Sequence, residues 1–358
     1  MTGNSDDARE AADLLREAIR TTGPRDPQLP WLRSNFGYAL LLGDQDDIDD
    51  TTLDEAVSAL EQATTSTPPE HTNYARCWMG LASALHLRWT RDADPAVLDR
   101  SIEAARTAVD AAPGNHPLLS TWLASLASAR YERSFLQRRP DVLGEAIETY
   151  RRLLLLTPED DAERATRFLL SLANLLTLRF ELTAEVSAVT EAADILRDLL
   201  RDSTLEPATQ AMAWHDLSFA LRMRHDSTGT CLDEAVAAAR QAVARSEVGN
   251  AERAERLANL AALLGRTHDG LDEAERIGRQ AVCECPPDHP GRPTVLSTFA
   301  SILWQRYHRF GGPGELDEAI ILLREAVAAT TEPVNHGIRL ATLASALRAR
   351  YARSPVRS

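Results

Sequence analysis

The sequence predicts an all-α protein built from repeated pairs of antiparallel helices, and three observations predict it. The four residues Leu-Asp-Glu-Ala occur at 53–56, 232–235, 271–274 and 316–319. Apolar residues recur with the helical period of about 3.6, and no useful stretch alternates with period two as a half-buried strand would. Aromatic residues make up only 5% of the chain while alanine is abundant, which favours closely packed helices over strands.

The Leu-Asp-Glu-Ala copies belong to a longer series of anchor positions spaced by 39 to 46 residues. The anchors are Ala8, Leu53, Leu98, Leu143, Val189, Leu232, Leu271 and Leu316. Self-similarity at a fixed period is the signature of a repeat architecture. We therefore expect an anchor helix in each repeat and a second helix between successive anchors, which gives about sixteen helices in about eight pairs.

Small residues mark the places where neighbouring helices are expected to cross. Three residues after each anchor the side chain is Ala or Ser. In each second helix one small residue follows a large apolar residue, and these small residues are Gly37, Ala82, Ala124, Ala173, Ser218, Ala261, Ala300 and Ala344. Thr52 and Glu55 have the spacing of a capping box, and Asp94-Pro95 that of a cap followed by a first-turn proline. Leu-Asp-Glu-Ala is therefore interpreted as a helix start and not as a chemical site.

The second helix resembles the tetratricopeptide repeat. Residues 78–85, Trp-x-x-Leu-Ala-x-x-Leu, and residues 214–221, Trp-x-x-Leu-Ser-x-x-Leu, are similar to the Trp-x-x-Leu-Gly-x-x-Tyr pattern of that family. The resemblance extends from Asp6 to Arg353. It departs from the family in its period, which is near 45 here against the usual 34. Long-period repeats of this kind look like those of actinobacterial tetratricopeptide proteins, many of which are joined to a CHAT peptidase domain; no β-rich stretch remains here to form one.

The resemblance implies a right-handed α-α superhelix that forms one domain over residues 1–358, with a short basic tail at 354–358. Each repeat would contact chiefly its neighbours, because one helix pair cannot bury its own apolar face. It also implies a non-enzymatic scaffold or adaptor, regulatory or signalling in role, that binds a partner protein or peptide in a concave groove. That groove would be lined by the first helix of each pair, and no cofactor or catalytic residue is expected.

Candidate groove residues are polar or aromatic side chains beside the Leu-Ala pair of each second helix. They are Asn35, Tyr38, Trp122, Asn174, His215, Asp216, Arg222, Asn259, Arg266, Trp304, Gln305 and Arg348. Arginine and asparagine donate to peptide carbonyls and carboxylates, and aromatic rings anchor apolar side chains. The chain contains no lysine, so the lysine-containing carboxylate clamp of chaperone-binding relatives is absent in its usual form.

Charge and composition restrict the classes of partner. The formal net charge of −14 argues against a general nucleic-acid binder and against an anionic membrane surface. No apolar run approaches the roughly 18 residues that a membrane helix needs. The four cysteines lack the spacing of a disulfide framework, and the chain begins with a polar, acidic stretch. These features predict a cytoplasmic protein.

Two alternative functions remain open. Asp46-Asp47-x-x-Asp50, within the acidic run 44–50, fits the diphosphate–magnesium motif of the all-helical terpene synthases, although it is predicted to lie in a loop and lacks a second metal motif. An EF-hand calcium loop fits worse, because Ile48 and Asp49 occupy places that need an oxygen ligand and a glycine. The other alternative is a self-assembling repeat protein that forms oligomers through its C-terminal helix. In that helix the Leu340, Leu343 and Leu347 face either caps the last repeat or docks a partner.

Other metal or catalytic groupings are interpreted as structural. Cys283, Cys285 and His289 offer three ligands crowded across two prolines, whereas a zinc site needs four at suitable spacing. The histidines at equivalent loop positions of different repeats are explained by the repetition better than by catalysis, and they are His71, His116, His289 and His336.

Overall fold

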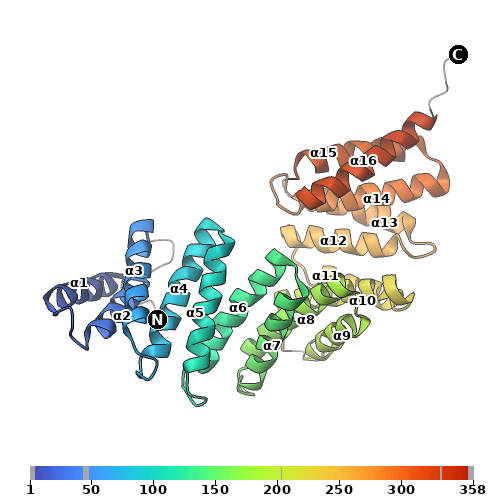
Figure 1. Ribbon diagram of the computed structural model, residues 1–358. Helices are drawn as coiled ribbons and strands as arrows, with labels where there is room; N and C mark the ends of the chain where they lie inside the picture. The colour runs from blue at the N-terminus through green and yellow to red at the C-terminus, as the bar shows by residue number, and fades with distance from the viewer. Residues whose placement is uncertain (1–4, 43–47, 203, 331–332, 354–358) are drawn as a thin grey trace. The chain divides into compact units, whose positions relative to one another are not determined.

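The computed structural model describes residues 5–42, 48–202, 204–330 and 333–353, and every regular element within them is an α-helix (Figure 1). The sixteen helices of this described part are α1 (Ser5–Thr21), α2 (Leu29–Leu40), α3 (Asp50–Ser66), α4 (Tyr74–Asp92), α5 (Pro95–Ala111), α6 (Leu119–Gln137), α7 (Pro140–Leu155), α8 (Ala162–Thr183), α9 (Val186–Leu199), α10 (Pro207–Thr228), α11 (Leu232–Ala244), α12 (Ala251–Leu264), α13 (Leu271–Glu284), α14 (Arg292–Phe310), α15 (Pro313–Ala328) and α16 (Pro333–Arg353). The predicted all-α class and helix number are confirmed. None of these helices combines the length and the apolar character that crossing a bilayer requires.

The anchor residues all lie in odd-numbered helices, and the Leu-Ala segments lie in even-numbered ones. Helices α11 and α13 begin at the leucine of Leu-Asp-Glu-Ala and carry its two carboxylates in their first turn. These carboxylates stabilise the positive end of the helix dipole. Helices α3 and α15 begin three residues earlier, at Asp50 and Pro313. The interpretation of this motif as a helix start is thus correct to within one turn.

Two predicted caps have different outcomes. Asp94 caps α5 as expected, because its carboxylate accepts from the backbone N–H of Ala96 at 2.9 Å and Pro95 occupies the first turn. The predicted capping box at Thr52 is wrong. Helix α3 starts earlier, and the carboxylate of Asp49 accepts the backbone N–H of Thr52 at 2.7 Å. Asp49 is the better cap because it precedes the first helical residue and its carboxylate is negatively charged.

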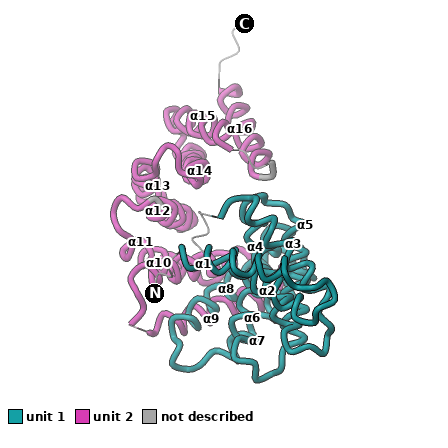
Figure 2. The backbone as a smooth tube through the Cα atoms, turned by 90° about the vertical axis from the view of Figure 1, so that its left-hand side faces the viewer, with its two compact units in different colours: residues 1–183 teal, residues 184–358 magenta. Residues whose placement is uncertain are grey.

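The chain divides into two compact units, residues 1–183 with α1 to α8 and residues 184–358 with α9 to α16 (Figure 2). Within each unit every helix packs on the next one along the chain. Successive even-numbered helices also contact each other, as α2 does α4 and α10 does α12. No pair of odd-numbered helices packs in this way over the described residues. Each unit therefore has an inner, even-numbered layer and a more widely spaced, odd-numbered layer. The expectation of one domain over residues 1–358 stays a prediction.

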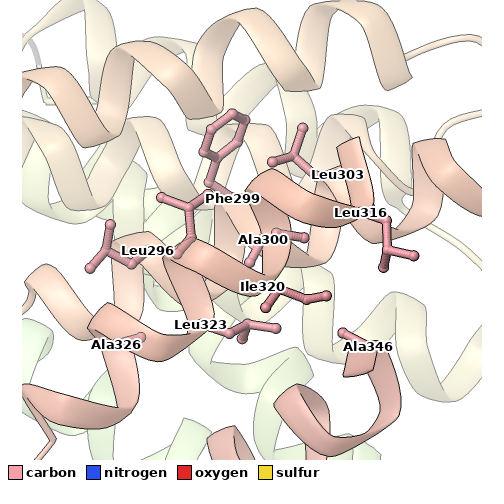
Figure 3. Packing of buried hydrophobic residues seen from close by; sticks show 11 residues of the cluster. Leu296, Phe299, Ala300, Leu303, Leu316, Ile320, Leu323, Ala326 and Ala346 are labelled. Carbon is pink, nitrogen blue, oxygen red and sulfur yellow. The ribbon is translucent and has the colours of Figure 1, made fainter. Parts of the chain in front are cut away.

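Small buried residues allow the helices of a pair to approach closely. Ala56 and Ala319, each three residues after an anchor, are both 0% exposed. Ser101, at the same place in α5, donates its hydroxyl to the carbonyl of Ala82 in α4 at 2.8 Å. Figure 3 shows part of the core between α14, α15 and α16, where Ala300 of α14 lies near Ile320 of α15. Ala319 belongs to the same core cluster. The prediction that small residues lie where helices cross is confirmed in these pairs.

Two of the predicted small positions need correction. In α6 the buried small residue is Ala127, which is 0% exposed and lies 45 residues after Ala82, whereas Ala124 is only half-buried. Residues 123–129 contain two Leu-Ala pairs three residues apart, nearly one helical turn, so the pattern alone selects the wrong pair. In α16 Ala344 is exposed, because no odd-numbered helix follows it among the described residues.

Candidate binding face

The predicted groove residues all lie on even-numbered helices, in two separate sets. The set in the first unit is Asn35 and Tyr38 on α2, Trp122 on α6 and Asn174 on α8. The set in the second unit is His215, Asp216 and Arg222 on α10, Asn259 on α12, Trp304 and Gln305 on α14 and Arg348 on α16, with Arg266 just beyond the end of α12. Each set is considered within its own unit.

Tyr38 holds α2 against α4. Its hydroxyl donates to the backbone carbonyl of Arg76 at 2.8 Å, and the Arg76 guanidinium lies 5.2 Å from the centre of its ring. Burial raises the pKa of Tyr38 to about 12, so the hydroxyl stays protonated and remains a donor. The half-buried Asn35 donates its side-chain amide to the carbonyl of Trp31 in its own helix at 2.9 Å. Both groups are therefore occupied within the first unit.

Trp122 lies in the core of the first unit. Its side chain is 5% exposed and its ring stacks on that of His116, with 4.5 Å between ring centres. Little of its surface is left for a partner. Asn174 on α8 is half-buried. The candidates of the first unit thus serve mainly to connect its own helices.

In the second unit a polar cluster forms between α10 and α12, and it consists of His215, Asp216, Ser218, Arg256 and Asn259. The side-chain amide of Asn259 donates to the hydroxyl of Ser218 at 2.7 Å. That hydroxyl donates in turn to the backbone carbonyl of His215 at 2.6 Å. Two predicted candidates, His215 and Asn259, are thereby brought together across neighbouring even-numbered helices.

Arg256 supplies a buried positive charge to the polar cluster. Its side chain is 8% exposed, and its Nη1 donates to the hydroxyl of Ser246 at 2.8 Å. Its Nη2 donates to the carboxylate of Glu252, also at 2.8 Å. Arg339 in α16 occupies the same place in its repeat and donates in the same way to Thr330 at 2.6 Å. These bonds fix the guanidinium of Arg256 beside α10.

Sequence reasoning missed Arg256, although a signal for it existed. The residue lies five positions before the small residue of its helix. In other repeats that place holds Leu32, Cys77, Trp122, Phe168, Ala213 and Val295. Arginine stands only at Arg256 and Arg339 in this otherwise apolar column, and a charge at such a place indicates a specific environment.

Burial changes the pKa values of His215 and Asp216 in opposite directions. Burial, together with the guanidinium charges of Arg256 and Arg222, lowers the pKa of His215 to about 4. It raises the pKa of Asp216 to about 7, against the opposing attraction of Arg256. At neutral pH the imidazole is therefore uncharged, and the carboxyl group lies near the midpoint of its titration.

Two atoms of this cluster have no hydrogen-bond partner within the described chain. They are Nδ1 of His215 and Oδ2 of Asp216, and both are enclosed. A buried polar group left unpaired costs about 1–3 kcal/mol. The pair therefore has an unused capacity to bind a ligand that offers both a donor and an acceptor.

Arg222 and Arg266 meet at one carboxylate beside the polar cluster. Nη1 of Arg222 lies 3.6 Å from Asp226, and Nε of Arg266 donates to the same carboxylate at 3.3 Å. Arg222 also covers the ring of Phe219, with 4.5 Å between the guanidinium carbon and the ring centre. The predicted residues of α10 and the α12 region are thus joined into one face, which we call the α10–α12 face.

The remaining candidates lie further along the second unit. Trp304 is half-buried and packs edge-on to His308, with 4.5 Å between ring centres. Gln305 and Arg348 are exposed. Among the described residues, no hydrogen bond or ion pair links these side chains to the polar cluster. In α16, Leu343 and Leu347 pack against the last core cluster, whereas Leu340 is 44% exposed.

The predicted magnesium motif is only partly visible, because Asp44, Asp46 and Asp47 lie outside the described residues. Of the rest of that run, Asp49 caps α3, and Asp50 pairs with Arg91 at 3.3 Å. Across the described part of the chain, no three His, Cys, Asp or Glu side chains lie close enough together to hold a metal ion.

No family model matches the chain, and no curated protein matches it. Among solved structures it is similar to a tetratricopeptide repeat protein from Parabacteroides merdae, with 14% identity, a TM-score of 0.55 and coverage of 94% of this chain and 99% of that one. It is also similar to human IFIT1, in a dimer with PPP-AAAA, with 13% identity, a TM-score of 0.49 and coverage of 97% and 70%. It is similar as well to yeast Tom70, with 14% identity, a TM-score of 0.45 and coverage of 97% of this chain and 74% of that one. The first likeness shows a tetratricopeptide-like fold, as the sequence resemblance implied.

Proposed function

We propose that this tetratricopeptide-like chain is a protein-interaction scaffold that binds an extended segment of a partner protein on its α10–α12 face. The observation that supports this most is the pair of enclosed, unpaired atoms on His215 and Asp216. An extended peptide carries an N–H donor and a carbonyl acceptor on each residue. Its N–H would donate to Oδ2 of Asp216, and a carbonyl would accept from Nδ1 of His215 in the tautomer that carries the proton there.

The surroundings of the pair suit a peptide ligand. Asn259 and Arg256 hold α12 beside α10 through Ser218 and Ser246, so the ligand would meet a preformed arrangement. A preformed site loses less conformational freedom on binding than a mobile one. Phe219 and Arg222 next to it supply an apolar surface and a positive charge.

Binding to this face should depend on pH in a defined direction. A donor N–H stabilises the charged form of Asp216 and lowers its pKa in the complex below the value of about 7 in the free protein. Affinity should therefore rise as the pH rises through 7, because the free protein must lose a proton before it binds. The affinity of Asp216→Asn should not vary with pH in this way.

The test uses the purified full chain and a random peptide display library. Selected peptides are measured by calorimetry against the protein, Asp216→Asn and the matched control Asp198→Asn on the odd-numbered helix α9, where Asp198 pairs only locally with Arg201. We expect Asp216→Asn to weaken binding by about tenfold or more, as loss of a charge-assisted hydrogen bond does. Asp198→Asn should bind as the unchanged protein does.

Circular dichroism on the same samples separates loss of binding from loss of folding. His215→Phe provides a second change within the cluster and keeps an aromatic ring. The proposal is wrong if selected peptides bind Asp216→Asn and His215→Phe as tightly as the parent protein, with no difference in pH dependence.

A further inference from the structure

A pocket of about 400 Å³ lies in the first unit, and we call it the edge pocket. It is formed by the connection between α1 and α2, the first turns of α2, the end of α3 and the connection between α3 and α4. Its volume falls within the range of about 300–1,000 Å³ that is typical of small-molecule sites. Nothing in the proposed peptide binding uses it.

The apolar wall of the edge pocket is rigid. It contains the prolines Pro24, Pro27, Pro30 and Pro68 together with Trp31. Proline fixes one backbone torsion, so these loops lose little freedom when a ligand binds. Trp31 belongs to the first turn of α2 and is 47% exposed. An aromatic ring half-covered by prolines is suited to stacking against another flat or apolar group.

Two unpaired guanidinium groups also line the edge pocket. Arg25 and Arg33 form neither an ion pair nor a hydrogen bond through their side chains with any residue that the structure describes. Most arginines here are paired, as Arg16 is with Glu55 at 2.9 Å. In a chain with 53 acidic and 39 basic residues, carboxylates are in excess, so two unpaired cations at one pocket need an explanation. The fork of a guanidinium matches carboxylate and phosphate oxygens.

One acidic side chain lines the pocket, and its carboxylate already accepts a backbone hydrogen bond. Asp26 lines the pocket, and its Oδ1 accepts the backbone N–H of Gln28 at 2.8 Å. Two guanidinium charges against one carboxylate leave the pocket locally positive on a protein whose net charge is −14. Local attraction for an anion is therefore built into the lining, against the charge of the whole chain.

Polar donors complete the lining. His71 accepts the backbone N–H of Asn73 on its Nδ1 at 3.1 Å, so the neutral ring carries its proton on Nε2, where it can donate. Asn73 precedes α4, yet its side chain does not cap that helix. The pocket thus combines donors, two cations and an apolar wall.

We propose that the edge pocket binds a small organic anion, a carboxylate or phosphate group carried on an aromatic or apolar body. The anion is held by Arg25 and Arg33, and the body packs on Trp31 and the prolines. The site is independent of the peptide face of the second unit, so either proposal can fail without the other.

The first experiment is calorimetry on the full chain with three probes that share an aromatic body. N-acetylphenylalanine carries a carboxylate, phenyl phosphate carries a phosphate group, and N-acetylphenylalaninamide is neutral. At least one anion should bind at least about tenfold more tightly than the neutral probe, and its affinity should fall as salt is added. Binding of only one anion identifies which of the two chemistries the site takes.

The second experiment compares variants that carry the same change. Arg25→Gln with Arg33→Gln should weaken the anion about tenfold or more, and Trp31→Ala should weaken it as well. The control is Arg152→Gln on α7, an exposed arginine of the same unit that has no side-chain partner among the described residues. The proposal is overturned if no anion binds at millimolar concentration, if the three probes bind alike, or if the double variant binds as Arg152→Gln does.

Discussion

The same place in the repeat is filled differently in the two units. Five residues before the buried small residue of an even-numbered helix, the first unit has Cys77, 0% exposed, and Trp122, 5% exposed. In the second unit that place holds the buried Ala213 and Val295, but also Arg256, 8% exposed, and Arg339, which precedes the exposed Ala344. The sulfur of Cys77 lies 3.7 Å from the hydroxyl of Thr67. Arg256 donates to the hydroxyl of Ser246 and also to the carboxylate of Glu252.

The apolar side chains at this place serve packing, whereas the arginine creates polar surroundings that are suited to recognition. The apolar side chains of the first unit close its even-numbered layer, which leaves Trp122 and Tyr38 occupied inside it. In the second unit a buried guanidinium keeps the layer polar and changes the pKa values of its neighbours His215 and Asp216. Repeats that share one backbone arrangement can therefore differ in function through the side chains at one position of the repeat.

The largest effect is expected from Trp122→Ala in the first unit. Removing a buried aromatic side chain leaves a cavity, and the free energy of unfolding should fall by about 3–5 kcal/mol. Trp31→Ala is the matched control, because that ring is 47% exposed and its loss should change stability by less than about 1 kcal/mol. Urea denaturation followed by circular dichroism measures both. Equal losses would mean that Trp122 is not a core residue.

A smaller effect is expected where the two units are alike. Ala56→Leu and Ala319→Leu each insert a larger side chain at a helix crossing that is 0% exposed, and should each destabilise by about 1–3 kcal/mol. Ala328→Leu, at an exposed place on α15, should change stability by less than about 0.5 kcal/mol. If thermal denaturation showed no loss for either buried variant, the assignment of the repeat would be wrong.

A third effect, which varies with pH, is expected from Asp216→Asn in the second unit. The folded-state pKa of Asp216 is raised from 3.8 to about 7, so its contribution to stability is present at low pH and is lost as the pH rises through 7. The folded-state pKa of His215 is lowered from 6.5 to about 4, so its contribution is lost as the pH falls from 6.5 towards 4. Relative to the parent protein, Asp216→Asn should become more stable as the pH rises from 4 to 7, by a few kcal/mol at most.

Denaturation at several pH values checks this sign. His215→Gln is the opposite control, since it should gain relative stability as the pH falls over the same interval. A difference between Asp216→Asn and the parent protein that does not vary with pH would show that the carboxyl group is exposed to water.

The sequence was sufficient for the fold because the repeat restates the same signals many times. Alanines three residues after each anchor indicated the crossings at Ala56 and Ala319, and the acidic first turns indicated the starts of α11 and α13. Errors arose where two equivalent patterns overlapped, as at Ala124 and Ala127, and where a helix began earlier than its motif, as α3 does before Thr52.

The site was less accessible to sequence reasoning because it depends on contacts between helices. That His215 and Asn259 share a face follows from the repeat, but the raised pKa of Asp216 depends on its burial, which the pattern of a single helix does not give. The edge pocket was not foreseen at all, since it joins two loops about 40 residues apart that carry no common motif.

The central claim is that the even-numbered layer of the second unit is the binding surface. Its most direct test places a photoreactive amino acid at Ala262, on the even-numbered helix α12, and at Arg276, on the odd-numbered helix α13. A peptide selected on the purified protein is then cross-linked to each. The account predicts cross-links at position 262 and none at 276; cross-linking at 276 alone, or equally at both, would contradict it.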